Sequence, residues 1–251
     1  MHIELRTFSG LKCRILESDG ARPGTSRLLV ILNHGFGAPG DDLVDIGGWL
    51  SESNDQLGEQ CTFVFPAAPV DLGPMGMPGG RAWWQINMAR LAEINQTKDF
   101  GELTNLKPDG LLEASQQLAE AIRELQRTYG VTDSRTVLGG FSQGAMVSTD
   151  VTLRHGIQPA LLLLFSGTLI CRDEWRKLAA HHEGCKVFQS HGLYDPILPF
   201  SPAKELEALL RESGFPIEFM EFAGQHTIPV TALQKSSQLL SALLTQNSGL
   251  D

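Results

Sequence analysis

Short apolar runs recur along the chain, each followed by a stretch with helical character, and this alternation most constrains the fold. Residues 28–32 read Leu-Leu-Val-Ile-Leu, a continuous run typical of a strand covered on both faces. The runs that we assign to strands lie at 28–32, 62–65, 136–138, 160–165, 186–190 and 216–222. Strands that alternate with helices predict an α/β protein with a mainly parallel central sheet and helices on both faces.

The first residues predict a different local structure. Residues 3–8 and 11–17 alternate loosely between apolar and polar side chains, and Ser9-Gly10 separates them. This short break predicts an N-terminal antiparallel hairpin. Residues 19–26 are polar, with glycine and proline, and are expected to form a loop.

Acidic residues mark the expected starts of two helices. Asp41 and Asp42 offer N-cap oxygens for a helix that runs through Leu50, and Asp109 offers one for a helix to about residue 128. The remaining predicted helices cover residues 145–151, 173–181, 202–213 and 230–244.

The segment from residue 67 to residue 108 departs from this alternation. Its prolines and glycines interrupt regular structure, and loops of that length in compact domains are usually functional or disordered. Its aromatic and methionine content argues against disorder. We therefore expect a single domain over residues 1–251, with an insertion at about 67–108 that shapes a ligand pocket.

Overall charge limits the classes of partner. The formal net charge is −9 and no run of basic residues occurs, whereas nucleic acids and anionic membranes are bound through Lys and Arg patches. We expect no nucleic-acid partner. The longest apolar run, 160–165, is too short to cross a bilayer, so no stable membrane insertion is expected.

The cysteines and the first residues bear on the compartment. The four cysteines form no C-x-x-C pair and are too few for a disulfide scaffold in 251 residues, so we expect reduced, mostly buried thiols. The N-terminus lacks the apolar segment of a signal peptide. Together these features favour the cytoplasm.

Residues 140–144, Gly-Phe-Ser-Gln-Gly, fit G-x-S-x-G, in which a serine occupies a strained turn between a strand and a helix. The apolar run before it and the helical stretch after it provide that context. The glycines fit because so sharp a turn leaves little room for side chains. Ser142 is therefore a candidate nucleophile.

A serine nucleophile needs a base, and the base needs a carboxylate that fixes its tautomer. In parallel sheets the ligand lies beyond the carboxyl ends of the strands, so these residues should lie on strand-end loops. Asp195 and His226 fit this placement, and the order Ser142, Asp195, His226 is that of α/β-hydrolases. The alternatives are that Asp195 only shapes a turn before Pro196 and that His226 is an ordinary loop residue.

The tetrahedral intermediate of such a reaction needs two N–H donors for its oxyanion. The backbone of Gln143, which follows the serine, would supply one. The glycine-rich loop 33–37 would supply the other from the backbone of Phe36. His34 could be a base, but we interpret it as a structural residue whose ring holds this loop.

Four motifs together resemble the phospholipase/carboxylesterase family of α/β-hydrolases, which includes acyl-protein thioesterases and small bacterial carboxylesterases. The motifs are His-Gly-Phe-Gly at 34–37, Gly-Phe-Ser-Gln-Gly at 140–144, His-Gly-x-x-Asp-Pro at 191–196 and Gly-x-His at 224–226. The resemblance implies the α/β-hydrolase fold and hydrolysis of small-molecule esters or thioesters without metal or cofactor. Carried over by position, Ser142 is the nucleophile, Asp195 the acid and His226 the base, with Phe36 and Gln143 as oxyanion donors.

The chain departs from this pattern at the places that face substrate. Eukaryotic thioesterases of the family have a second Asp in the His-Gly-Asp-x-Asp-Pro stretch, where this chain has Leu193. Residues 81–84, Arg-Ala-Trp-Trp, look more like the bacterial carboxylesterases. The mechanism is unaffected by these differences, but a protein-depalmitoylating role does not carry over.

The insertion is expected to line an acyl pocket, because methionine and aromatic side chains make adaptable apolar surface. The candidates are Met75, Met77, Trp83 and Trp84, although the two tryptophans could instead pack the insertion onto the sheet. The favoured function is a serine carboxylesterase, a monomer or homodimer, acting on short to medium acyl chains. The alternatives are a lysophospholipase or thioesterase and, more remotely, a non-catalytic binding protein on a hydrolase fold.

Overall fold

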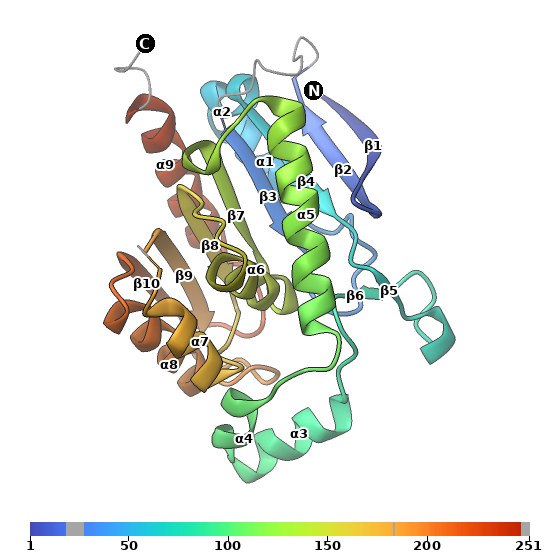
Figure 1. The fold of residues 1–251 in the computed structure, drawn as a ribbon, viewed down its shortest axis with the longest axis vertical. Coiled ribbons are helices and arrows are strands. Elements are labelled where there is room, and N and C mark those ends of the chain that lie inside the picture. The colour runs from blue at the N-terminus through green and yellow to red at the C-terminus, as the bar shows by residue number, and fades with distance from the viewer. Residues whose placement is uncertain (19–27, 183, 247–251) are drawn as a thin grey trace.

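An eight-stranded sheet runs through the computed structural model, which describes residues 1–18, 28–182 and 184–246 (Figure 1). In spatial order its strands are β1 (His2–Phe8), β2 (Leu11–Glu17), β4 (Cys61–Pro66), β3 (Leu28–Asn33), β7 (Thr136–Phe141), β8 (Leu161–Phe165), β9 (Lys186–Gly192) and β10 (Ile217–Phe222). β1 and β2 pair antiparallel, as do β2 and β4, and the remaining pairs are parallel. The predicted parallel sheet and N-terminal hairpin are confirmed. The predicted loop at 19–26 lies outside the described residues.

Helices cover both faces of this sheet (Figure 1). On one face lie α5 (Leu111–Tyr129), α6 (Gln143–Arg154), α7 (Arg172–Ala179) and α8 (Phe200–Glu212). On the other lie α1 (Val44–Ser53), α2 (Asp55–Gln60) and α9 (Val230–Gln246). Both faces need covering because both are apolar. On β3, Leu29 and Ile31 pack against the α5–α8 face, while Leu28, Val30 and Leu32 pack against the face of α1, α2 and α9.

The predicted aspartate caps are wrong, although both helices are present. Leu43 occupies the N-cap position of α1, and Asp41 instead pairs with Arg14, at 3.0 Å between carboxylate and guanidinium. At α5 the N-cap is Gly110, in a left-handed conformation with φ of +88°. That backbone conformation favours glycine, so the chain reaches α5 through Gly110 rather than through a cap by Asp109.

The insertion is more regular than predicted. It contains β5 (Val70–Asp71), paired with β6 (Arg81–Ala82), and a 3-10 turn, η1 (Gly73–Met75). Two helices follow, α3 (Met88–Thr97) and α4 (Phe100–Asn105), and they lie beyond the carboxyl ends of the central strands (Figure 1). A second 3-10 turn, η2 (Asp133–Arg135), precedes β7.

The cysteines and helix lengths also bear on the sequence-based predictions. Cys13, Cys61, Cys171 and Cys185 are all free and buried, as expected. Burial raises the pKa of the Cys61 thiol to about 12, which keeps it protonated and unreactive. In the part of the chain that the structure describes, no helix combines the length and the apolarity that crossing a membrane requires.

Candidate active site

Ser142 lies at the turn between β7 and α6, with φ of 55° and ψ of −117°. A serine at positive φ is strained, and such strain is typical of functional sites. The turn forms because of its glycines: a Cβ at Gly140 or Gly144 would overlap the backbone carbonyl of Asn33 on β3. The Ser142 N–H donates to the Phe165 carbonyl at 2.8 Å, which anchors the turn to β8. The strand–turn–helix context expected for G-x-S-x-G is therefore present.

The side chains of Asp195 and His226 meet beyond the ends of β9 and β10. Nδ1 of His226 lies 2.7 Å from Oδ2 of Asp195. Oδ1 of Asp195 accepts the N–H groups of Ile197 and Leu198, each at 2.9 Å. A carboxylate held in this way favours the tautomer with the proton on Nδ1, which leaves Nε2 of His226 able to accept another proton. The imidazole also packs on Phe141, the neighbour of Ser142, with ring centroids 4.7 Å apart.

A second histidine, His191, lies behind the same carboxylate. It is fully buried, and its Nε2 lies 2.8 Å from the Leu198 carbonyl and 3.4 Å from Oδ2 of Asp195. Burial lowers the pKa of His191, so the ring is neutral and donates from Nε2 to the carbonyl. His191 therefore supports the loop that carries Asp195 (the acid loop) from within, whereas the His226 side chain is partly exposed.

His34 holds the loop that follows β3. Its Nδ1 lies 2.7 Å from the Gly35 carbonyl, and its Nε2 accepts the Ala68 N–H at 2.9 Å. Both ring nitrogens are therefore bonded to backbone, as a neutral ring with its proton on Nδ1 requires. Burial lowers the pKa of His34 to about 4. These bonds agree with the structural role of His34. Neither of its ring nitrogens is free to act as a base.

The same loop lies against the serine turn. A Cβ at Gly35 would be 3.3 Å from the Cβ of Ser142, so only a residue without a side chain brings the loop this close without displacing its neighbour. Phe36 is the next residue of this loop, and its role as an oxyanion donor stays a prediction. Gln143 begins α6 directly after Ser142, and its role as the second oxyanion donor stays a prediction.

The side chain of Gln143 has a role that the sequence analysis missed. It is fully buried; its Oε1 accepts the Trp83 N–H at 2.9 Å and its Nε2 donates to the Trp84 carbonyl at 2.8 Å. Trp83 in turn donates from Nε1 to the His34 carbonyl at 3.0 Å. These bonds fasten the insertion to the start of α6 and to the loop at 33–37. The only signal in the sequence was an amide side chain inside the pentapeptide.

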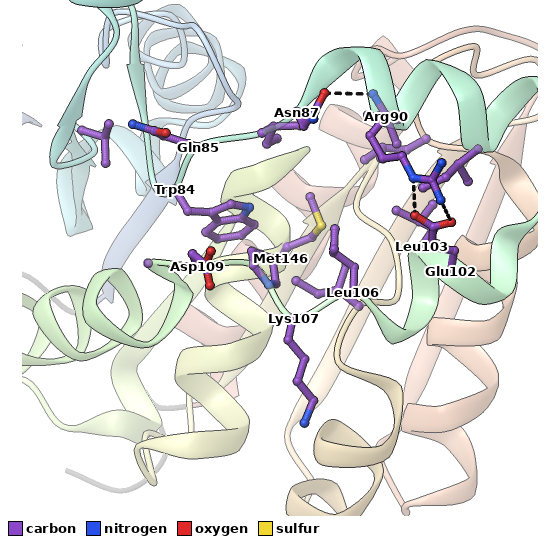
Figure 2. Close-up of a pocket in the computed structure, with 18 of the residues that line it drawn as sticks. Trp84, Gln85, Asn87, Arg90, Glu102, Leu103, Leu106, Lys107, Asp109 and Met146 are labelled. Atoms are coloured by element: carbon purple, nitrogen blue, oxygen red, sulfur yellow. Dashed lines mark hydrogen bonds and ion pairs between the residues drawn. The ribbon is translucent and has the colours of Figure 1, made fainter.

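A pocket of about 680 Å³ opens beneath the insertion (Figure 2). Its apolar lining includes Trp84 and Met146, and Leu198 lines it from the acid loop. Arg90 and Glu102 lie on its wall and form a two-pronged ion pair that joins α3 to α4. The pocket thus extends from the helix that follows Ser142 to the loop that carries Asp195.

The predicted substrate contacts divide into two groups. Met75 and Trp84 are among the residues that line this pocket, and the described lining does not include Met77 or Trp83. Both tryptophans are buried in the core, and Trp83 alone of the two has an indole N–H that bonds to the His34 carbonyl among the described residues. Met77 is 40% exposed and its Cε lies beside Gly37. Trp83 therefore has the packing role that the sequence left open for it.

One group of described residues has the donor types of a metal site. Ligand atoms of His2, Glu4 and Glu17 lie within 4.8 Å of one another. Glu17 ends β2, which runs antiparallel to β4, so the group lies at the opposite end of the sheet from Ser142. This cluster is separate from the candidate active site.

Comparison with known proteins identifies the family. The phospholipase/carboxylesterase family profile matches residues 21–244. The chain belongs to this family. It is 29% identical over 198 residues to acyl-protein thioesterase 1 of Emericella nidulans, covering 74% of this chain and 76% of that protein. It is 26% identical over 230 residues to an esterase of Drosophila pseudoobscura pseudoobscura, covering 86% of this chain and 71% of that one.

Solved structures that resemble this chain support the assignment to the phospholipase/carboxylesterase family. The crystal structure of esterase PE8 superposes with a TM-score of 0.75 at 26% identity, covering 93% of this chain and 99% of that one. A carboxylesterase from Mesorhizobium loti superposes with a TM-score of 0.70 at 17% identity, covering 96% and 99%, and shows the shared fold. The chain is therefore an α/β-hydrolase in a family of esterases and thioesterases.

Proposed function

We propose that the chain is a serine carboxylesterase in which Ser142 is the nucleophile, His226 the base and Asp195 the acid. The observation that carries this proposal is the 2.7 Å contact between His226 and Asp195, made beside the strained turn of Ser142. A serine hydroxyl becomes a strong nucleophile only when a base takes its proton, and His226 has an acceptor nitrogen left for that purpose.

The proposed reaction has two halves. Nε2 of His226 takes the proton of the Ser142 hydroxyl as the oxygen attacks the ester carbonyl, and the protonated ring then gives that proton to the leaving alcohol. Water repeats these steps on the acyl-enzyme and releases the acid. In both halves the N–H groups of Phe36 and Gln143 stabilise the oxyanion. The proposed mechanism uses no metal or cofactor.

The acyl chain is proposed to enter the pocket under the insertion. Met75 and Trp84 would line its path, together with Met146 and Leu198. Apolar walls favour an acyl group over a charged one, because burying an unpaired charge is costly. We propose short to medium chains as the substrate class.

A thioesterase or lysophospholipase is the second candidate. It is supported by the similarity to acyl-protein thioesterase 1 of Emericella nidulans. The same triad can cleave an oxygen ester or a thioester, so the preferred substrate depends on which leaving group binds beside Ser142. Values of kcat/KM on p-nitrophenyl esters, lysophospholipids and acyl thioesters would rank the three, and a dominant value for thioesters would replace the favoured assignment.

Replacing the nucleophile tests the proposal. Ser142→Ala should lower kcat on p-nitrophenyl butyrate by about a million-fold, as loss of a triad serine does. Ser134→Ala, at an exposed serine in η2, is the matched control and should keep full activity. A fluorophosphonate probe should label the wild type and the control but not Ser142→Ala. A folded Ser142→Ala protein that retains turnover would contradict the proposal, and an unlabelled wild type would favour a non-catalytic protein.

A further inference from the structure

Asn95 on α3 of the insertion contacts the loop that carries Asp195. Its side-chain Nδ2 donates to the Pro196 carbonyl at 3.1 Å and to the Ile197 carbonyl at 2.9 Å. These bonds join two segments that are remote in sequence. They also lie at the place where the pocket wall and the acid loop meet, since Ile94 of α3 and Leu198 both line the pocket.

The two carbonyls belong to the same peptide groups that hold the acid. The Pro196 carbonyl and the Ile197 N–H form one peptide group, and that N–H donates to Oδ1 of Asp195. The Ile197 carbonyl and the Leu198 N–H form the next, and that N–H donates to the same oxygen. Each peptide plane is therefore bonded to Asn95 at one end and to Asp195 at the other. Because a peptide group is planar, fixing the carbonyl also fixes the direction of the N–H.

We propose that Asn95 is a positioning residue for Asp195, through which the insertion orients the two peptide groups that hold the acid. This inference rests on the proposed function. Hydrogen bonds in series polarise one another, so the bonds from Asn95 also strengthen the two N–H donors that hold the carboxylate. The far side of the loop is held by His191, which donates to the Leu198 carbonyl. Asn95 holds the loop from the side of the insertion.

The test compares Asn95→Ala with Gln96→Ala. Gln96 is the next residue of α3; it is exposed, also carries an amide, and has no described bond to the acid loop. Alanine favours helices over both asparagine and glutamine, so neither change should unfold α3. Loss of two hydrogen bonds should lower kcat on p-nitrophenyl butyrate about tenfold in Asn95→Ala with KM little changed. Gln96→Ala should match the wild type.

A third variant separates hydrogen bonding from shape. Asn95→Asp has nearly the same size but places a carboxylate oxygen opposite the two carbonyls, so it should lose at least as much kcat as Asn95→Ala. Full kcat in Asn95→Asp would overturn the proposal, because the side chain would then matter only for packing.

A double-mutant cycle tests whether Asn95 acts through the acid. In an Asp195→Asn background, Asn95→Ala should cause little further loss of kcat, because the group that it positions is already disabled. The same fold-loss in both backgrounds would overturn the proposal, and so would equal kcat for Asn95→Ala and Gln96→Ala. If the wild type hydrolyses no ester, the proposed function itself fails, and this inference with it. An active wild type with an unaffected Asn95→Ala variant overturns the inference alone.

Discussion

Nδ1 of His226 lies 2.7 Å from Oδ2 of Asp195, although the two residues are 31 positions apart in the chain. The register of the sheet explains this contact. β9 and β10 pair in parallel with Gly192 opposite Phe222, so the two strands end side by side. Each loop then needs only a few residues to bring its side chain to the same point.

We expect Asp195→Asn to lower kcat about ten thousand-fold. The amide oxygen would keep the bonds from Ile197 and Leu198, which turns the amide NH2 toward Nδ1 of His226. The imidazole must then carry its proton on Nε2 and is unable to accept one from Ser142. Steady-state kinetics on p-nitrophenyl butyrate would measure the loss. Asp99→Asn, at an exposed aspartate, is the control. Activity within tenfold of the wild type would exclude Asp195 as the orienting acid.

The two tryptophans should respond differently to substitution. Trp84→Ala removes a wall of the pocket and should reduce the preference for hexanoyl over acetyl esters, as a ratio of kcat/KM, by about tenfold. Trp83→Phe removes the donor to the His34 carbonyl and should lower the free energy of unfolding by about 1–3 kcal/mol without changing that ratio. Chain-length profiles and urea denaturation measure the two effects. An altered profile in Trp83→Phe with normal stability would reverse these assignments.

A pair of glycine substitutions tests the packing of the serine turn. Gly144→Ala would drive a Cβ into the Asn33 carbonyl, which is backbone and has little freedom to move. We expect a loss of unfolding free energy of about 3 kcal/mol or more. Gly48→Ala is the matched control, because it lies in helix α1 and its Cβ would meet no described atom within 4 Å. That variant should gain up to about 1 kcal/mol. Similar stabilities in urea would show that the close approach tolerates a methyl group.

Protonation of His34 should destabilise the protein at acid pH. Its pKa is about 4 in the folded state, against an ordinary value near 6.5. Burial is the main cause; the bond to the Gly35 carbonyl opposes it, Arg81 lowers the pKa further and Asp41 raises it. Between these two values the unfolded chain binds the proton and the folded chain does not. Stability due to His34 is therefore complete above pH 6.5 and declines as the pH falls toward 4.

A comparison with His34→Gln, whose side chain does not titrate, would measure the size of this effect. The difference in unfolding free energy between wild type and variant should shrink by about 2.5 kcal/mol between pH 7.5 and pH 4.5. Urea denaturation at both values measures it, and other titrating groups cancel because both proteins share them. Parallel pH dependence in the two proteins would show that His34 is not the responsible group.

The sequence by itself determined the layers of the fold and the place of the candidate site. Continuous apolar runs are a local property, and burial on both faces of a parallel sheet requires them, so the strands could be predicted from the order of residues. The serine turn could also be predicted, because G-x-S-x-G is a pattern of five consecutive residues, although the carbonyl that excludes side chains at its glycines belongs to Asn33 of β3. Since ligands lie beyond the carboxyl ends of such strands, Ser142, Asp195 and His226 could be chosen from the strand-end loops.

Only the tertiary structure decided which side chains hold that site together. His191 and His226 both border Asp195, and burial separates their roles. The His191 side chain is fully buried and supports the loop, whereas that of His226 is 12% exposed. Helix α3 was missed because few of its residues are buried, and the apolar spacing that reveals a helix comes from burial. The bonds that Gln143 and Asn95 make to backbone carbonyls join segments distant in the chain. Such bonds depend on distance in space, which residue spacing does not record.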